Sequence, residues 1–227
     1  MVPLSDTTET ETPALASDTL REGIVDRLRT TLGDAVVEVH LEPNVDLWVR
    51  VRHDAWRETG LALRDQGFHY FCFLSAIDWQ PSPFGRGEDD PSAPAPEPDD
   101  PAAEPEMRHG VTGGDTRFQV FARVTDVQRH VGITIKADVP DDSSVVDSWV
   151  TVYAGANWHE RETHEMFGIG FAGHPDLRNI YLPTDFEGHP LRKDFPLLAR
   201  IVKPWPGIAD VEPLPGEGDE GDGGASE

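Results

Sequence analysis

The 227-residue sequence has little of what disulfide-bonded, cluster-binding or membrane-spanning chains require. Its single cysteine, Cys72, excludes an intrachain disulfide and cannot by itself hold an iron–sulfur cluster. The longest apolar run, near residues 71–77, is too short to cross a bilayer. The N-terminal residues lack the basic and apolar regions of a signal peptide. These absences predict a cytosolic chain that reaches a membrane only through partners.

Positive charge is also scarce, since 19 Lys and Arg stand against 42 Asp and Glu, for a net charge of −23. Residues 1–18, 86–108 and 210–227 together carry −17 of it, which leaves −6 for the rest. Nucleic acids and anionic lipids both require basic surface. The composition therefore argues against direct binding to either.

Composition also divides the chain. Residues 1–17 and the acidic end at 210–227 are predicted to be disordered, because neither has the apolar content of a core. Residues 80–114 form an acidic insertion with eight prolines between positions 81 and 105. A solvated loop is the favoured interpretation of this insertion, and a docking arm is the alternative.

The remaining residues predict an α+β domain over 18–168. Ser144 and Asn157 are the expected N-caps of its last two helices, and Gly168 is the expected left-handed stop of the final one. Strands in hairpins with helices between them favour a two-layer sandwich, a mixed or antiparallel sheet with helices on one face. The predicted helices cover 19–32, 54–66, 145–152 and 158–167, and the predicted strands cover 35–39, 47–51, 69–79, 117–124 and 130–139.

An extended irregular C-terminal tail, residues 169–209, is expected after Gly168. Prolines recur there every six to eight residues, which excludes a helix or a central strand. Large apolar residues nevertheless continue through it. An irregular segment cannot bury such residues on itself, so a partner protein is the predicted cover and the tail is predicted to gain order on binding.

One cluster of side chains raises an enzymatic alternative, a free-standing metal-dependent hydrolase. Imidazole and carboxylate groups are ligands of zinc and non-haem iron. However, His159 and His164 are five residues apart, which places them on different sides of a helix. No phosphate-binding loop, dinucleotide fingerprint or nucleophile elbow occurs, so we expect no catalytic, cofactor-binding or metal-binding residue. The cluster consists of His159, Glu160, Glu162, His164 and Glu165, with His174 and His189 beyond it.

The same stretch resembles a known family. The motifs Glu160-Arg161-Glu162, Met166-Phe167-Gly168-Ile169, Gly173-His174-Pro175 and 188–196 (GHPLRKDFP) are similar to the signature of the C subunit, also called the "30 kDa" subunit, of proton-pumping NADH–quinone oxidoreductase, respiratory complex I. The expected partner-binding residues are Glu160, Arg161, Glu162, Phe167, Gly168, His174, Pro175, Leu177, Arg178, Gly188, Pro190, Leu191, Arg192, Lys193, Asp194, Phe195 and Pro196.

The resemblance implies an α+β domain with an extended C-terminal region on a neighbouring subunit. Similar subunits lie in the hydrophilic arm of bacterial complex I, beside the subunit that forms most of the quinone cavity. The complex transfers electrons from NADH to quinone and couples this to proton translocation, using FMN and iron–sulfur clusters held by partner subunits. This chain is then expected to act in structure and assembly, as a peripheral subunit at the cytoplasmic face of the cell membrane.

Overall fold

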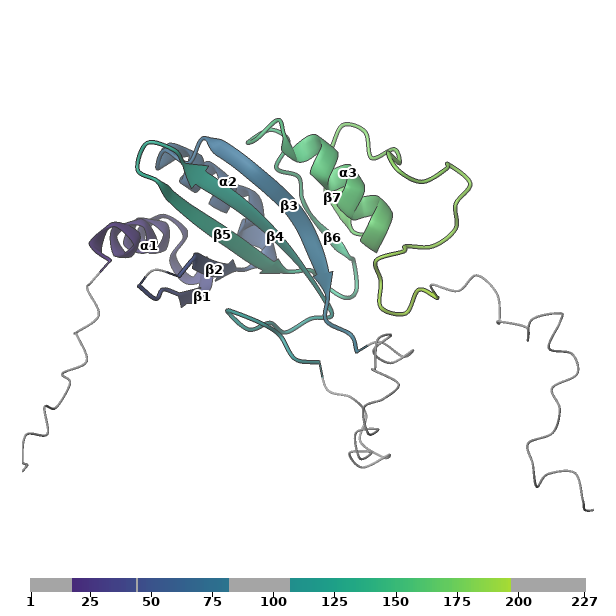
Figure 1. Ribbon diagram of the computed structural model, residues 1–227, viewed down its shortest axis with the longest axis horizontal. Coiled ribbons are helices and arrows are strands. Elements are labelled where there is room, and N and C mark those ends of the chain that lie inside the picture. The colour runs from purple at the N-terminus through teal and green to yellow at the C-terminus, as the bar shows by residue number, and fades with distance from the viewer. Residues whose placement is uncertain (1–17, 44, 82–106, 197–227) are drawn as a thin grey trace, which may run out of the picture. The chain divides into compact units, whose positions relative to one another are not determined.

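The computed structural model describes residues 18–43, 45–81 and 107–196 (Figure 1). The predictions for 1–17 and 210–227 fall outside these residues, as do those for most of the insertion and for 197–209 of the tail. Within the described ranges, no helix combines the length and apolar character needed to cross a membrane.

Three α-helices and seven strands make up the described part of the chain. Short 3-10 turns at Gly33–Ala35 and His53–Ala55 follow α1 and precede α2. The helices are α1 (Thr19–Leu32), α2 (Trp56–Asp65) and α3 (Ala156–Phe167), and the strands are β1 (Val36–His40), β2 (Leu47–Val51), β3 (Tyr70–Asp78), β4 (Phe118–Asp126), β5 (Val131–Asp138), β6 (Val145–Asp147) and β7 (Gly170–Ala172).

The first seven predicted elements are present in the predicted order. Helix α1 begins after Asp18, whose carboxylate accepts a hydrogen bond from the Arg21 backbone N–H at 3.1 Å and so caps the helix. Ile24 and Leu28 are buried, as expected for one apolar face. Strand β2 coincides with the predicted range 47–51, and the bounds of β4 and β5 lie within two residues of the predicted ranges 117–124 and 130–139.

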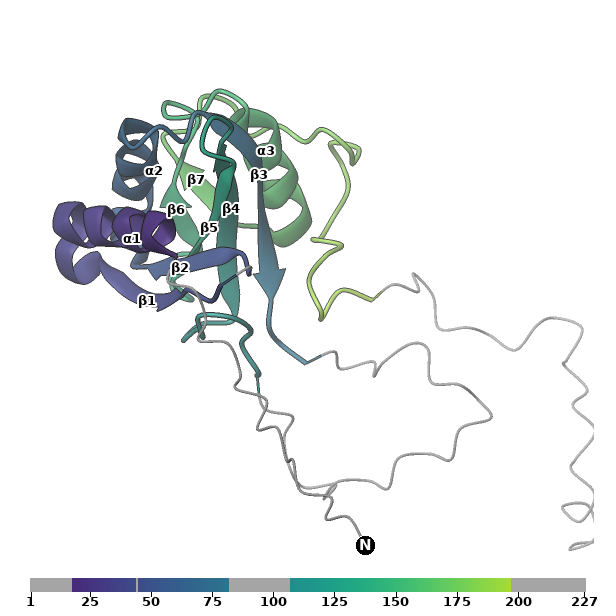
Figure 2. The same ribbon diagram turned by 60° about the vertical axis from the view of Figure 1, so that its left-hand side comes forward.

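Five strands form a mixed sheet in the order β1-β2-β5-β4-β3. All neighbours are antiparallel except β2 and β5, which run parallel with Leu47 opposite Ile133 and Val51 opposite Ala137. Figure 2 shows α1 and α2 on one side of this sheet, whereas α3 lies against the edge strand β3. The predicted α+β class with a mixed sheet is confirmed.

Two tryptophans connect α2 to the segment that follows β6. The rings of Trp56 and Trp149 stack with centroids 4.5 Å apart, and the Trp149 indole N–H donates to the Trp56 carbonyl at 2.8 Å. Both side chains are fully buried. Gly60 makes room for them, since a Cβ at this position would lie 3.0 Å from the Trp149 ring.

The predicted helix over 145–152 is wrong. Residues 145–147 instead form β6, which pairs in parallel with β7 at the start of the predicted irregular tail. Ser144 has a φ of 49°, which is not the conformation of an N-cap, and its carbonyl accepts from the Gly170 N–H at 2.8 Å. Long-range pairing and burial of Val146 therefore override the local capping signal.

The end of the acidic insertion also differs from expectation. Residues 107–114 were predicted to be part of a solvated loop, yet their backbone carbonyls accept hydrogen bonds from the sheet. The Lys136 ammonium donates to the Val111 and Gly113 carbonyls at 2.6 and 3.1 Å, and the Gln119 amide donates to Gly113 at 3.0 Å. Burial lowers the pKa of Lys136 to about 8. Composition gave no sign of this packing because it uses main-chain groups.

Two glycine substitutions test the Trp149 packing. Gly23→Ala in α1 should raise the free energy of unfolding by up to about 1 kcal/mol, because the new Cβ meets only Arg27, at 3.7 Å. Gly60→Ala should lower it by about 1–3 kcal/mol, because the hydrogen-bonded, stacked Trp149 has no room to move. Urea denaturation of both variants provides the comparison, and an equal gain in both would contradict the proposed close packing.

Candidate partner-binding site at helix α3 and residues 173–195

Helix α3 carries the signature and ends as predicted. Gly168 has a φ of 75°, and its N–H donates to the His164 carbonyl at 2.8 Å, so it is the expected left-handed C-cap. The helix begins at Ala156, however, so Asn157 lies inside it and is not the N-cap. Glu160, three residues after Asn157, does not close a capping box with it.

Glu160 instead fixes α3 to the turn after β6. Its fully buried carboxylate accepts from the Ser148 hydroxyl at 2.6 Å and from the Trp149 N–H at 2.5 Å. Burial raises the pKa of Glu160 to about 7, although both hydrogen bonds act in the opposite direction. This carboxylate is therefore an internal structural group.

Glu165, one turn further on, holds the irregular segment. Its buried carboxylate accepts from the consecutive backbone N–H groups of Ile180 and Tyr181, both at 3.1 Å, and from that of Leu182. Burial alone would raise the pKa of Glu165, but the three N–H donors outweigh it and hold the pKa below its usual range. A stretch without helix or sheet thus finds its hydrogen-bond acceptors on α3.

The C-terminal carbonyls of α3 are satisfied by the same segment. The His189 ring nitrogen Nδ1 lies 2.8 Å from the Glu165 carbonyl, and the Leu191 N–H donates to Met166 at 3.1 Å. The Arg192 guanidinium donates to the Phe167 carbonyl at 2.6 Å. A cation at this position also matches the negative end of the helix dipole.

Asp78 at the end of β3 provides the last attachment. Its buried carboxylate accepts two hydrogen bonds from Arg117, at 3.0 and 2.7 Å, and one from the Lys193 N–H at 2.8 Å. Asp194 pairs with the same arginine at 3.1 Å. Burial would raise the pKa of Asp78, yet the Arg117 and backbone N–H donors together lower it. A strand end more than a hundred residues earlier in the sequence therefore holds the RKDF motif.

Arg161 attaches the first part of the segment. Its guanidinium donates to the Arg178 carbonyl at 2.8 Å and to the Asn179 carbonyl at 3.3 Å. It also lies over the ring of Trp158, 5.8 Å from the centroid. His174 reaches back to the Asn157 carbonyl at 3.2 Å, and burial lowers the pKa of its ring.

The structure brings the predicted partner-binding residues to one region but separates them by exposure. Glu160 and Phe167 are buried within the chain, which leaves a direct partner contact to the others. The half-buried members are Arg161, Glu162, Gly168, His174, Leu177, Pro190, Arg192 and Phe195, and the exposed members are Pro175, Arg178, Gly188, Leu191, Lys193, Asp194 and Pro196.

Sequence reasoning missed Asp78 and Arg117. Asp78 resembles any carboxylate at a strand end, and it does accept a turn hydrogen bond from the Gln80 N–H at 3.0 Å. Its contact with Lys193 spans 115 residues, so no local pattern contains it.

The alternative of a metal-dependent hydrolase gains no support. In the described ranges, no three His, Cys, Asp or Glu side chains lie close enough together to hold a metal ion. Each histidine of the predicted cluster has another contact. His159 packs edge-on against Phe71, and His164 lies 2.8 Å from the Ile169 carbonyl.

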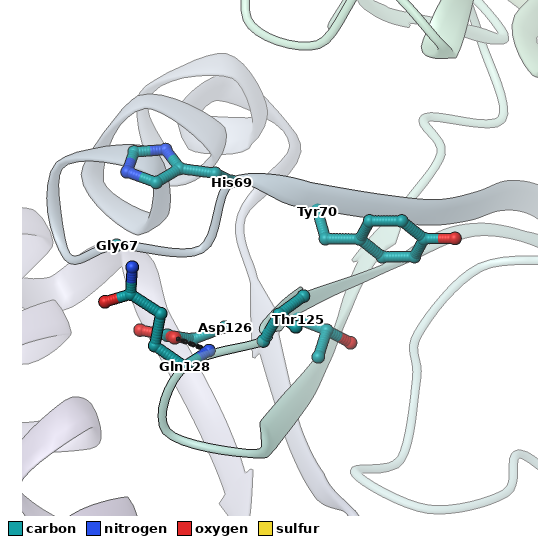
Figure 3. Close-up of a pocket in the computed structure, with 7 residues that line it drawn as sticks. Gly67, His69, Tyr70, Thr125, Asp126 and Gln128 are labelled. Carbon is teal, nitrogen blue, oxygen red and sulfur yellow. Dashed lines mark hydrogen bonds between the residues drawn. The ribbon is translucent and has the colours of Figure 1, made fainter.

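A surface hollow of about 370 Å³ lies between the start of β3 and the β4–β5 turn (Figure 3). The Asp126 carboxylate beside it accepts from the Gln128 and Arg129 N–H groups at 2.9 and 3.0 Å, so it organises the turn. Figure 3 shows the His69 ring turned away from this carboxylate. The hollow is lined by none of the signature residues.

Comparison with solved structures finds the same fold in another protein. A chain in the solved structure of the membrane-bound sulfane sulfur reductase, an archaeal respiratory membrane complex, shares the fold with a TM-score of 0.57. It is 18% identical, and the match covers 80% of this chain and 88% of that one. The fold is thus one also found in a respiratory membrane complex.

Sequence relatives give the family. The pattern of "Respiratory-chain NADH dehydrogenase, 30 Kd subunit" matches residues 95–200. The C subunit of NADH-quinone oxidoreductase from Stenotrophomonas maltophilia is 32% identical over 197 residues, 78% of either chain. The C/D subunit from Cronobacter sakazakii is 42% identical over 98 residues, which is 43% of this chain but 16% of that protein. The chain belongs to the family of the 30 kDa subunit, the C subunit of NADH-quinone oxidoreductase, and the predicted resemblance is confirmed.

The burial of Glu160 predicts a pH-dependent stability difference. A carboxyl group whose pKa is raised from 4.5 to about 7 on folding stabilises the protein below pH 4.5, and this contribution is lost as pH rises through 7. The free energy of unfolding of Glu160→Gln, relative to that of wild type, should therefore rise by up to about 3 kcal/mol between pH 4.5 and pH 8. Denaturation curves at several pH values measure the difference.

Ser148→Ala is the companion variant. It keeps the titrating carboxylate but removes a hydrogen bond that lowers the pKa, so its pH dependence should persist and move to higher pH. If the free energies of unfolding of wild type and Glu160→Gln changed with pH in parallel, the raised pKa of Glu160 would be contradicted.

The Asp78 attachment is tested by Asp78→Asn. Loss of the charge removes the paired hydrogen bonds from Arg117, so amide exchange of residues 188–195 should accelerate at least about tenfold. Asp54→Asn, which breaks the exposed pair with Arg52, is the control and should leave exchange in that segment unchanged. Hydrogen exchange with peptide-level mass spectrometry measures both, and unchanged exchange in Asp78→Asn would refute the attachment.

Proposed function

We propose that the chain is a structural and assembly subunit in the hydrophilic arm of a bacterial NADH–quinone oxidoreductase that couples electron transfer to proton translocation. In this proposal it docks on the quinone-cavity subunit through α3 and residues 173–196. It associates peripherally with the cytoplasmic face of the cell membrane through the complex. Family membership supports the assignment to the complex, and the geometry of α3 supports the docking role.

The observation that carries the docking role is how residues 173–195 satisfy their backbone. Glu165, Asp78, Arg161 and the end of α3 take up its N–H and carbonyl groups. Apolar, cationic and acidic side chains are then left on the outside, and the exposed large apolar residues and Arg178 are of the types that interfaces use. The large exposed apolar residues of this region are Trp158, Tyr181, Phe186 and Leu191.

The redox chemistry belongs to other subunits in this proposal. One cysteine cannot supply the thiolates of an iron–sulfur cluster. Two carboxylates of α3 that could act as acids or bases, Glu160 and Glu165, hold backbone N–H groups instead. FMN and the clusters are therefore assigned to partner subunits, and no catalytic residue is assigned to this chain.

Truncation tests the proposal in cells of the source organism that lack the chromosomal copy. Deleting residues 173–209 should abolish assembly, whereas deleting the acidic residues 210–227 should leave it near the wild-type level. The first cut spares β7, which pairs with β6 and belongs to the domain. Native gels and membrane NADH–quinone oxidoreductase activity are the readouts. Normal assembly of the chain lacking 173–209 would overturn the docking role.

A further inference from the structure

Residues 178–182 cover one face of α3 along two of its three turns and leave the first turn exposed to solvent. Arg161 and Glu165, four residues apart, both bind the backbone of residues 178–182. Trp158 continues the same row, since positions 158, 161 and 165 share one side of a helix. The Arg161 guanidinium lies over its ring, yet within the described chain Trp158 remains 66% exposed.

Two further side chains extend this surface. Tyr181, whose N–H is bound by Glu165, is 65% exposed. Arg178 has a side chain that is 80% exposed and uses only its Nε atom, in a 2.7 Å contact with Asp176. Among the described residues, its two terminal nitrogens have no hydrogen-bond partner. We call Trp158, Arg161, Arg178 and Tyr181 the arginine–tryptophan patch.

We infer that the arginine–tryptophan patch is the energetic centre of the docking surface and binds a carboxylate-bearing, partly apolar segment of a neighbouring protein subunit. This inference rests on the proposed function and adds the partner's chemistry. Trp, Tyr and Arg are the residues that most often dominate interface energies. The fork of Arg178 accepts a carboxylate through two parallel hydrogen bonds, and an adjacent apolar group covers the Trp158 ring.

Charge distinguishes this occupant from the alternatives. Arg161 and Arg178 bring two positive charges to the patch, where Asp176 accepts from Arg178 and the buried Glu165 carboxylate accepts from the Tyr181 N–H. Among the described residues, the terminal nitrogens of the Arg178 guanidinium stay without a hydrogen-bond partner, on a chain whose net charge is −23. A carboxylate of the partner is attracted to the exposed guanidinium of Arg178, which fixes its position on the patch. A second copy of this chain, related by twofold symmetry, would instead bring like charges together.

Point variants of the full chain test the patch in the native complex. Trp158→Ala with Arg178→Glu should lower the amount of assembled complex about tenfold or more, since both replace interface anchors. Arg178→Lys keeps the charge and should retain more complex than Arg178→Glu. Tyr70→Ala with Arg52→Glu is the matched control, because these side chains are similarly exposed outside the patch and should leave assembly unchanged. Thermal unfolding of each purified variant checks folding.

A photo-crosslinking phenylalanine analogue at position 158 identifies the occupant in the assembled complex. A crosslink to a peptide of another subunit that contains Asp or Glu supports the inference. Crosslinks only to residues 197–227 of the same chain, or to a second copy, overturn it. Equal assembly of wild type and the double variant also overturns it but leaves the proposed function intact. A wild-type chain that never co-migrates with NADH–quinone oxidoreductase activity overturns both.

Discussion

The end of helix α3 leaves backbone carbonyls that no helical residue can satisfy, and the rest of the C-terminal structure depends on how they are paired. A buried polar group without a partner costs about 1–3 kcal/mol. His189, Leu191 and Arg192 supply the missing groups. Glu165 does the reverse and supplies acceptors for three backbone N–H groups. The helix end and the irregular segment thus satisfy each other's backbone hydrogen bonds, and no further helix or sheet is needed for this.

This exchange separates two roles within α3 and the segment that follows it. Glu160 and Glu165 are buried and hold backbone groups in place. In contrast, Trp158, Arg178 and Leu191 are exposed and can contact a partner. The dense charge of α3 suggested a metal site because both arrangements use histidine and glutamate. Burial tells them apart, since each carboxylate that faces inward is fully occupied by N–H or O–H donors.

The sequence was sufficient where structure is local. The ranges of β2, β4 and β5, the range of α1 and the glycine that ends α3 each follow from residues within one element. It was insufficient where distant segments decide. Val145 to Asp147 became a strand because Gly170 to Ala172 lies beside it, and Asp78 became part of the site because Lys193 reaches it. Neither pairing has a signal within a few residues of either position.

The parallel pairing of β2 with β5 has a consequence during synthesis on the ribosome. Leu47, Val49 and Val51 are almost fully buried, but their neighbours on β5 begin at Val131. At about 5–20 residues per second, the strand waits roughly 4–16 s for its partner after leaving the ribosome. During that interval an apolar strand edge is open to other chains. Nascent chains halted within the acidic segment should therefore be the form of this protein that chaperones bind most strongly.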